Sequence, residues 1–204
     1  MSAAAVEEPY RPYHSEPLTL LEHANELMEQ HPGHRVEIIG GVITAAPPPD
    51  VPHARVLTKL MKPFLAAGLD GEEGEVLQGV GLWLPTGPED YAIPDLVVVD
   101  ADIHERLIEN NCYDPVSFRL VLEVTSIDFN KDLRNKVAAY AEAKIPVYVI
   151  VNRKHGRVHV LTDPVEGGYD THRVHAPGER ITLPESIGAE VTLDVEAVLA
   201  AGRP

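Results

Sequence analysis

Two carboxylates and one lysine stand at positions in this sequence where a purely structural protein seldom places charge. Glu123 lies near the end of the apolar run 120–124, and Asp95 directly precedes the apolar run 96–99. A carboxylate taken out of water without a partner costs several kcal/mol or shifts its pKa, so such an acid is usually paired or holds a cation. Lys136 stands among the apolar positions of the segment after Glu123. Two acids at strand ends and a lysine from an adjacent element are typical of metal-dependent phosphodiester hydrolysis.

The order of the apolar runs predicts that the two acids meet. If the runs 96–99 and 120–124 pair in antiparallel fashion, the start of the first lies across from the end of the second. Both carboxylates then reach the same end of one sheet.

The segment after Glu123 predicts how the lysine joins them. A strand over 120–124, a helix over 131–144 and a strand over 147–151 form a compact crossover, which implies a parallel pair and a mixed sheet. Lys136 borders the buried stripe expected on this helix, which consists of Leu133, Val137, Tyr140 and Ala141. We therefore expect Lys136 to point back towards the strand ends.

Periodicity predicts further helices and strands on both sides of this centre. The expected helices cover 18–29 with Thr19 as the cap, 55–67 with a kink at Pro63, 102–111, and a terminal helical turn over 195–201. The expected strands are a pair within 35–46 that turns at Gly40 and Gly41, the segments 75–85, 91–100 and 156–163, and a further pair within 167–183.

Length and composition fit one domain of mixed α and β structure over residues 17–204, preceded by a flexible arm over residues 1–16. A single cysteine, Cys112, excludes an intrachain disulfide framework and a cysteine-based zinc site, and it favours a reducing compartment. No segment approaches the length that spans a bilayer, and the first residues lack a basic region followed by a long apolar stretch. We therefore expect a cytoplasmic protein with no membrane partner.

The formal net charge of −15 is the main argument against a nucleic-acid substrate, because phosphate binding usually requires a basic surface. Bound divalent cations would offset part of this charge. A local basic cluster also lies near the acids in the sequence, and it consists of Lys131, Arg134, Lys136, Arg153, Lys154 and Arg157. Long-range attraction for a polyanion is nevertheless expected to be weak.

The acids resemble the PD-(D/E)xK nuclease signature, in which two acids bind magnesium and a lysine assists the attacking water. Pro94-Asp95 and Glu123-Val124-Thr125 are similar to this signature. The lysine normally stands two residues after the second acid, where this chain has Thr125.

This departure resembles one branch, the Uma-two type of bacterial restriction-endonuclease-like proteins. In that branch an E-V-x-S pattern is followed by a lysine displaced onto the next helix and by an A-Y-A stretch. Ser126, Lys136 and the run 139–141 fit this pattern. The resemblance extends upstream to the run 36–41, the proline-rich turn and His53.

The resemblance implies a restriction-endonuclease-like α/β (α+β) fold, with a mixed β-sheet core flanked by helices and an extra N-terminal helix and strands. Asp95, Glu123 and the Val124 carbonyl would hold Mg²⁺ or Mn²⁺, hard cations that prefer oxygen ligands. Lys136 would orient the attacking water or stabilise charge on the phosphorane, and His53 would contact the phosphate or modulate the site. The substrate would be nucleic acid, preferably DNA, and the protein would be a homodimer.

The same charged residues also have structural interpretations. Asp95 after a proline could be a turn residue at a strand entry. Glu123 could pair structurally with an arginine such as Arg119 or Arg134, and Lys136 could be a surface lysine whose stem covers apolar neighbours.

The histidines give no independent sign of a metal site. His53 could be a residue that starts a helix. His159, His172 and His175 show no convincing zinc spacing, and we expect them on the surface.

Two other functions fit the same residues. One is a nuclease-derived binding or regulatory protein without turnover, which the acidic charge and the lack of a DNA-reading module favour. The other is a metal-dependent hydrolase of a different phosphoester.

Overall fold

The computed structural model describes residues 17–125 and 132–203. The arm expected over residues 1–16 lies outside the described residues. The α-helices are α1 (Leu20–Gln30), α2 (Val51–Ala66), α3 (Asp132–Glu142) and α4 (Val195–Ala201), and 3₁₀ turns cover Ile103–Arg106, Pro115–Ser117 and Glu185–Ile187. The strands are β1 (Arg35–Ile39), β2 (Val42–Ala46), β3 (Gly74–Leu77), β4 (Gly81–Trp83), β5 (Tyr91–Ala92), β6 (Leu96–Asp100), β7 (Leu107–Glu109), β8 (Cys112–Tyr113), β9 (Phe118–Thr125), β10 (Val147–Asn152), β11 (Arg157–Val165), β12 (Gly168–His175), β13 (Arg180–Leu183) and β14 (Val191–Asp194). None of the helices in these two ranges is both long and apolar enough to cross a membrane.

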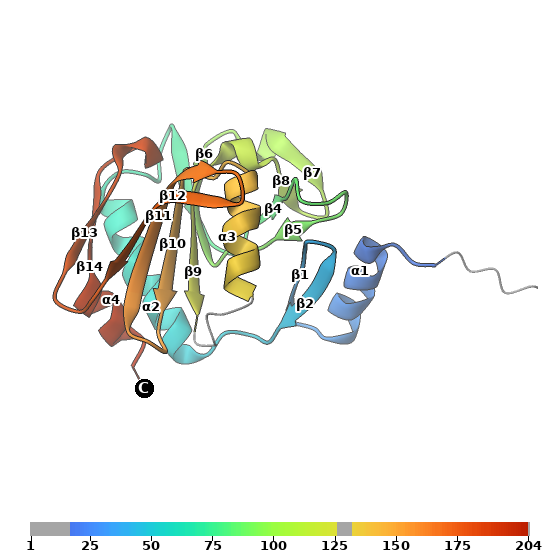
Figure 1. The fold of residues 1–204 in the computed structure, drawn as a ribbon, viewed down its shortest axis with the longest axis horizontal. Coiled ribbons are helices and arrows are strands. Elements are labelled where there is room, and N and C mark those ends of the chain that lie inside the picture. Colours follow the sequence, from blue (N-terminus) through green and yellow to red (C-terminus); the bar gives the residue numbers. More distant parts are fainter. Residues whose placement is uncertain (1–16, 126–131, 204) are drawn as a thin grey trace, which may run out of the picture.

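A six-stranded mixed sheet in the order β12-β11-β10-β9-β6-β3 forms the centre of the fold (Figure 1). Strands β9 and β10 pair in parallel, and α3 makes the crossover between them, as the sequence predicts. On its other side β9 pairs with β6 in antiparallel orientation. This pairing confirms the geometry that was expected to bring the two acids together.

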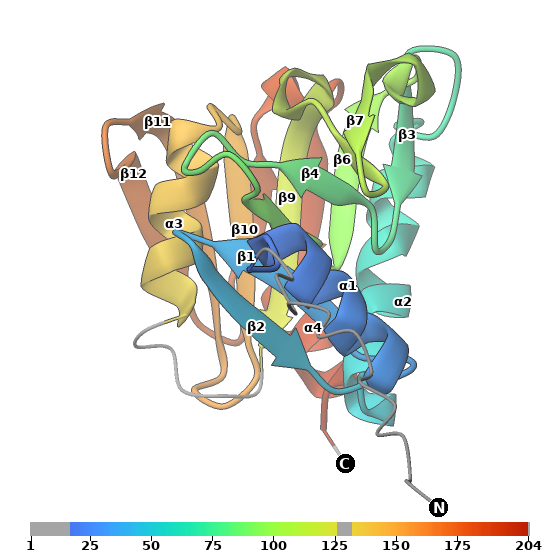
Figure 2. The ribbon, with the colours of Figure 1, turned by 90° about the vertical axis from the view of Figure 1, so that its right-hand side faces the viewer.

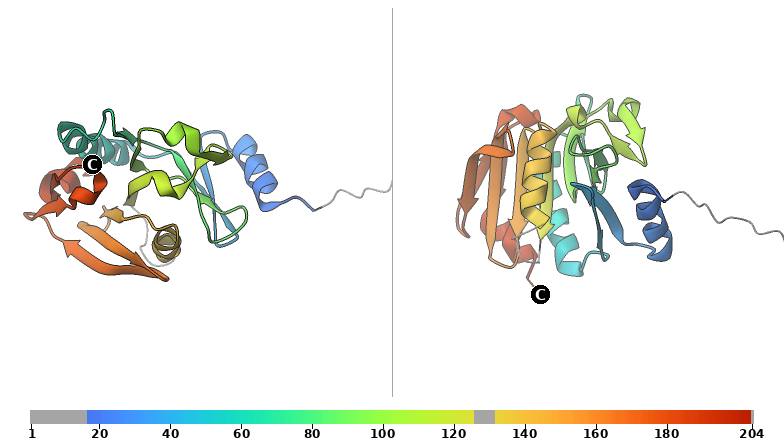
Figure 3. Two further views of the ribbon diagram at one scale, coloured as in Figure 1. Left: turned by 90° about the horizontal axis from the view of Figure 1, so that it is seen from above. Right: turned by 45° about the vertical axis from the view of Figure 1, so that its right-hand side comes forward.

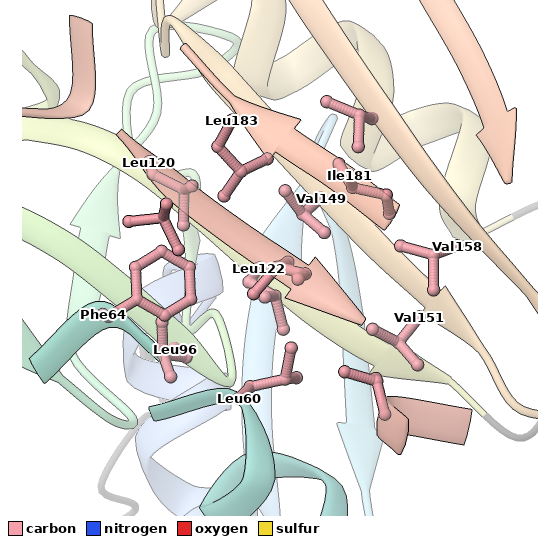
Figure 4. Packing of buried hydrophobic residues seen from close by; sticks show 14 of the residues in the cluster. Leu60, Phe64, Leu96, Leu120, Leu122, Val149, Val151, Val158, Ile181 and Leu183 are labelled. Carbon is pink, nitrogen blue, oxygen red and sulfur yellow. The ribbon is translucent and has the colours of Figure 1, made fainter. Parts of the chain in front are cut away.

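One face of the central sheet is covered by α2, α4 and the two-stranded sheet of β13 and β14. Figure 4 shows Leu60 and Phe64 of α2 on the side of the sheet that carries Leu122, with Ile181 and Leu183 of β13 close by. Complete burial of one such side chain contributes about 1.5 to 3 kcal/mol. Among the described residues, this face holds the largest hydrophobic cluster.

The opposite face carries α3 and part of a second six-stranded sheet, in the order β2-β1-β5-β4-β8-β7 (Figure 3). Side chains alternate between the two faces of a strand. Leu122 of β9 therefore belongs to the first face, whereas Val121 packs on this second face with Tyr140 of α3 and Tyr148 of β10. Glu123 has the same parity as Val121, so the strand directs its carboxylate towards α3.

Strand β1 divides its residues between two surfaces in the same way. Val36 and Ile38 pack against Ala24 of α1, and Figure 2 shows α1 lying beside β1 and β2. The alternate residues Arg35 and Glu37 point away from α1. The N-terminal helix thus holds in place a strand that presents two charged side chains to the centre of the molecule.

The ends of the first two helices follow capping chemistry. The Thr19 Oγ1 accepts a hydrogen bond from the Glu22 N–H at 3.1 Å, and the Glu22 carboxylate accepts one from the Thr19 N–H at 2.8 Å, which confirms the expected cap as a capping box. Helix α2 begins at Val51, earlier than expected. The reason is that the Asp50 carboxylate caps it by accepting from the His53 N–H at 2.7 Å.

Two of the expected strands are each divided between the two sheets. Segment 75–85 forms β3 in the central sheet and β4 in the second sheet, with Gly79 between them at φ +66°. Segment 91–100 is divided into β5 and β6, with Pro94 between them. A glycine or proline that breaks a strand lets the chain cross between sheets. The alternation of apolar and polar residues in the sequence does not reveal such a break. Asp95 lies at the second crossing.

Two further expectations are wrong. The helix expected over 102–111 is only the 3₁₀ turn at Ile103–Arg106, followed by the hairpin of β7 and β8. Asn110 and Asn111 turn this hairpin with φ of 51° and 55°, values that belong to a type I′ turn. The two strands expected within 167–183 form as β12 and β13, but they do not pair with each other, because β12 pairs with β11 and β13 pairs with β14.

His159 contradicts the expectation of a surface histidine. Its side chain is buried, and its Nδ1 lies 2.9 Å from the Nε2 of His172 on β12. Burial, followed by the nearby His172, lowers the pKa of His159 from 6.5 to about 4. The imidazole therefore stays neutral in the folded protein at pH values where an exposed histidine takes up a proton.

We predict that His159 reduces the stability of the protein in mild acid. The unfolded chain protonates this residue as the pH falls through about 6.5, whereas the folded protein resists protonation down to about pH 4. The contribution of His159 to stability is therefore complete above the unfolded pKa and is lost progressively between these two values. Urea titrations at a series of pH values should show a shallower loss of unfolding free energy for His159→Phe than for the wild type.

The exposed His155 provides the matched control. His155→Phe should keep the wild-type pH dependence. Equal slopes for the wild type and His159→Phe would contradict the prediction.

Candidate active site

The two predicted acids lie together at one end of the central sheet. Leu96 of β6 is paired with Leu122 of β9 in antiparallel orientation. The next position at this end of the ladder places Asp95 opposite Glu123, with both side chains on the same face. The Asp95 Oδ2 accepts a hydrogen bond from the Val124 N–H at 2.7 Å. Both side chains are almost completely buried. The predicted meeting of the two carboxylates is confirmed.

Lys136 lies beside them, as its position on the helix predicts. Its Nζ donates to the Glu123 Oε1 at 2.7 Å and to the Glu37 Oε1 at 2.8 Å, and the residue is 8% exposed. Tyr140, one turn further along α3, donates its hydroxyl to the same Glu123 oxygen at 2.8 Å. Residues four apart share one helix face, so α3 presents both donors to Glu123.

The contacts bear on each structural interpretation. Asp95 does stand at a strand entry, and Glu123 does lie 3.8 Å from an arginine, although that residue is Arg35. Lys136 is not a surface lysine. Arg119 does not pair with Glu123, because its Nε donates to the Asp100 Oδ1 at 2.6 Å. Arg134 is exposed.

Glu37 and Arg35 are site residues that the sequence interpretation missed. Glu37 is 5% exposed and also accepts a hydrogen bond from the Ile93 N–H at 2.8 Å. The signal was present, because Glu37 is a lone acid in an apolar run in the same way as Glu123. Arg35 stands two residues earlier, so a strand places both side chains on one face.

Arg35 contacts both predicted metal ligands. Its Nη1 donates to the Asp95 Oδ1 at 2.6 Å and to the Ile93 carbonyl at 2.9 Å. Its Nη2 lies 3.8 Å from the Glu123 Oε2. The guanidinium group therefore spans Asp95 and Glu123.

His53 approaches the site from the first turn of α2. Its Nε2 lies 3.4 Å from the Asp95 Oδ1. The capping residue Asp50 also accepts two hydrogen bonds from Arg153, at 2.8 and 3.0 Å. Asp50 thus orients the helix end that carries His53 and holds Arg153 at the border of the site.

The charges of the cluster shift one another's pKa values. Burial raises the pKa of Asp95, but the hydrogen bond from His53 and the charge of Arg35 outweigh it, and the net pKa lies below the ordinary value. Burial raises the pKa of Glu123 more than Lys136 lowers it, so its pKa is raised. Burial lowers the pKa of Lys136, but Glu123 and Glu37 raise it above the usual value. Burial and the nearby Glu123 also raise the pKa of Tyr140, whose hydroxyl therefore remains a donor.

A cleft of about 790 Å³ opens onto this cluster. Arg35, Glu37, Asp95, Glu123 and Lys136 line its floor, and the hairpin of β1 and β2 with the proline run 47–49 forms a wall. Of the expected basic cluster, Lys136 and Arg153 line the cleft, whereas Arg134, Lys154 and Arg157 are exposed. Lys131 and Ser126 lie outside the described residues.

The donor set suits a hard divalent cation. Asp95 and Glu123 supply carboxylate oxygens, and the N–H of Val124 points to Asp95. Within a strand the N–H and C=O of one residue point to the same side, so the Val124 carbonyl also points towards β6. Within residues 17–125 and 132–203, no three carboxylate, imidazole or thiol side chains form a ready metal cage. Mg²⁺ is commonly held by one or two carboxylates, with water and substrate phosphates as the other ligands. Asp95 and Glu123 can supply these carboxylates once Arg35 and Lys136 release them.

Known proteins similar to this chain include a sequence family and several solved chains. The sequence model of the Uma2 family, described as a putative restriction endonuclease, matches residues 21–196. A crystal structure described as a putative nuclease belonging to DUF820, from Anabaena variabilis ATCC 29413, superposes with a TM-score of 0.68. It is 14% identical in sequence, and the alignment covers 92% of this chain and 100% of that chain. Its fold is therefore similar to the one described above. No curated protein matches the chain.

We predict that Lys136 stabilises the fold through the two buried acids. Removal of one partner from a buried ion pair typically costs about 3 to 5 kcal/mol, because the remaining charge has no compensation. Lys136→Met should therefore lower the unfolding free energy by about this amount in metal-free buffer. Denaturant titration measures the loss.

A double variant tests the cause. Addition of Glu37→Gln to Lys136→Met removes one uncompensated carboxylate and should restore part of the stability. Lys59→Met, which changes an exposed lysine on α2, is the matched control and should have little effect. A loss as small in Lys136→Met as in this control would contradict the prediction.

Proposed function

Because the chain belongs to the Uma2 family of putative restriction endonucleases, we propose that it is a metal-dependent endonuclease that hydrolyses phosphodiester bonds in nucleic acid, with DNA as the substrate. The observation that best supports this proposal is the meeting of Asp95, Glu123 and Lys136 on the floor of one cleft. These groups come from β6, β9 and α3, so only the tertiary fold brings them together.

Asp95, Glu123 and the Val124 carbonyl would hold Mg²⁺ or Mn²⁺. All are oxygen donors, which hard cations prefer. The chemistry that such an ion supplies when bound is polarisation of the phosphate and a lower pKa for a water molecule.

Lys136 would act as a fixed positive charge at the reacting phosphate. Its ammonium is held by Glu37 and Glu123, so its position is set before the substrate arrives. A donor that is already oriented in a dry site can orient the attacking water and stabilise charge on the phosphorane without reorganisation. Glu37 serves as a positioning residue, because it holds Lys136 from the opposite side.

Two other groups would support this arrangement. Tyr140 donates to Glu123 and fixes one of its oxygens, so it is a positioning residue. His53 lines the cleft beside Asp95, where its imidazole can donate to a phosphate oxygen.

The charges of the site favour an anionic substrate only when a cation is bound. Glu37, Asp95 and Glu123 carry three negative charges when ionised, and Arg35 and Lys136 carry two positive ones. The balance of one negative charge would repel a phosphodiester. A divalent cation reverses the balance to one positive charge, which matches the single negative charge of the phosphodiester. The local charge can therefore favour the substrate even though the whole chain has a net charge of −15.

A nuclease-derived binding or regulatory protein without turnover is the second candidate. The acidic net charge and the pairing of Asp95 with Arg35 favour it. The same assay separates the two functions, because only an enzyme accumulates product with time.

We predict that the protein nicks supercoiled plasmid DNA in the presence of Mg²⁺ or Mn²⁺. Glu123→Gln keeps the shape of the side chain but removes its charge, and loss of one such electrostatic group typically lowers turnover about 10²- to 10³-fold. Gel electrophoresis of the plasmid over time measures the rate. Glu105→Gln, which changes an exposed acid, should cleave at the wild-type rate.

Two results would contradict this function. Cleavage by Glu123→Gln at the wild-type rate would remove the acid from the mechanism. Stable binding of DNA by the wild type without cleavage in either metal would favour the second candidate.

We also propose that the protein is a cytoplasmic homodimer, in which two symmetric sites cut the two strands of a duplex. A two-fold dimer is the commonest closed assembly of identical chains. Analytical ultracentrifugation at micromolar concentration should give twice the chain mass of 22.3 kDa. A species with the mass of a single chain would contradict the dimer but not the nuclease activity.

A further inference from the structure

Arg35 occupies the space between the two acids that would bind a metal ion. One of its terminal nitrogens lies 2.6 Å from Asp95 Oδ1, and the other lies 3.8 Å from Glu123 Oε2. A single guanidinium group therefore contacts both carboxylates.

The other carboxylate oxygens have different partners. The Asp95 Oδ2 accepts from the Val124 N–H, and the Glu123 Oε1 accepts from Lys136 and Tyr140. The Asp95 Oδ1 and the Glu123 Oε2 both face Arg35, and the Asp95 Oδ1 also lies 3.4 Å from the His53 Nε2. A divalent cation between Asp95 and Glu123 would have to take the place of the guanidinium group.

We propose that Arg35 is a built-in competitor of the divalent cation and that, once displaced, it becomes a phosphate-binding residue. This inference rests on the proposed metal site at Asp95 and Glu123. It assigns to Arg35 two positions, one on the carboxylates before the ion binds and one on the substrate phosphate afterwards.

Arg35 is placed to make this change. Its side chain is 29% exposed, in contrast to 10% for Lys136, and it lines the cleft. Its Nε is buried without a hydrogen-bond partner, so the present position leaves one donor unused. Lys136 is held by two carboxylates from different strands, and release from Glu123 would leave it bound to Glu37.

The released guanidinium group is suited to phosphate. Its N–H donors form a planar fork that binds two phosphate oxygens at once, which an ammonium group cannot do. Because Arg35 remains attached to β1 at the wall of the cleft, its head can stay close to the reacting centre.

Coupling between the metal and the phosphodiester follows from these two positions. Binding of the ion removes Arg35 from its carboxylates, and a phosphodiester gives it a new anionic partner. Each ligand should therefore increase the affinity for the other by the same factor. Without substrate, the apparent metal affinity equals the intrinsic affinity multiplied by the fraction of molecules in which Arg35 has left the site.

Calorimetric titration of the metal-free protein with Mn²⁺ tests the competition directly. If Arg35 occupies the site in nine of ten molecules, its removal raises the affinity about tenfold. Arg35→Gln should therefore bind Mn²⁺ at least about tenfold more tightly than the wild type. Arg35→Lys keeps the charge but cannot span both carboxylates, so it should fall between the two.

The matched control is Arg153→Gln. Arg153 also lines the cleft, but it pairs with Asp50 and contacts neither Asp95 nor Glu123. Its removal lowers the positive charge near the site without removal of a competitor, so the Mn²⁺ affinity should change less than in Arg35→Gln. An equal increase in both variants would show a general charge effect and overturn the competition.

The second arm repeats the titrations with dimethyl phosphate, the simplest phosphodiester anion. The wild type should bind Mn²⁺ more tightly in its presence, and Arg35→Gln should lose most of this gain. Equal gains in both proteins would remove the phosphate-binding role.

Thermal melting of the same proteins separates a folding defect from an effect on the site. Metal-free Arg35→Gln should melt at a lower temperature than the wild type and should gain more from saturating Mn²⁺. Equal Mn²⁺ affinities for the wild type and folded Arg35→Gln would overturn the role of Arg35 while the proposed metal site stands. An absence of Mn²⁺ binding in both folded proteins would overturn the metal site and this inference together.

Discussion

The structure depends on the attraction between opposite charges that are buried between its two six-stranded sheets. Glu37, Asp95 and Glu123 are each less than one-tenth exposed, and Lys136 lies among them with both its carboxylate contacts below 3 Å. Any one of these groups alone would be costly to bury. Together they oblige β1, β6, β9 and α3 to meet at one point, so the geometry of the site and the packing of the fold are the same constraint.

The second sheet has a functional reason within this constraint. The central sheet and α3 supply Asp95, Glu123 and Lys136, but these leave Lys136 with one carboxylate. Strand β1 adds Glu37 on the other side of the ammonium, and α1 holds β1 through Val36 and Ile38. The N-terminal elements α1 and β1 therefore contribute to the candidate site.

The sequence could predict the part of the site whose residues lie on regular elements or directly beside them. The antiparallel pairing that joins Asp95 to Glu123 and the helix position of Lys136 follow from strand and helix periods alone, and both are confirmed. The role of Glu37 could not be derived in the same way. Its partner Lys136 is 99 residues away in the sequence. A local hydrophobic period does not predict that β1 and α3 will pack beside each other.

The two strands that the sequence predicted as continuous, 75–85 and 91–100, are divided for one physical reason. Gly79 and Pro94 interrupt apolar runs that read as continuous strands, and the chain uses each interruption to leave one sheet for the other. The same interruption places Asp95 on the floor of the cleft, because β6 begins immediately after the crossing. Asp95 lies just outside β6, so its backbone takes no part in the strand pairing. Its side chain instead accepts the hydrogen bond from the Val124 N–H that the backbone of a continuous strand would have accepted. The break that misleads a count of alternating residues is therefore the feature that lets the Asp95 carboxylate bond to β9.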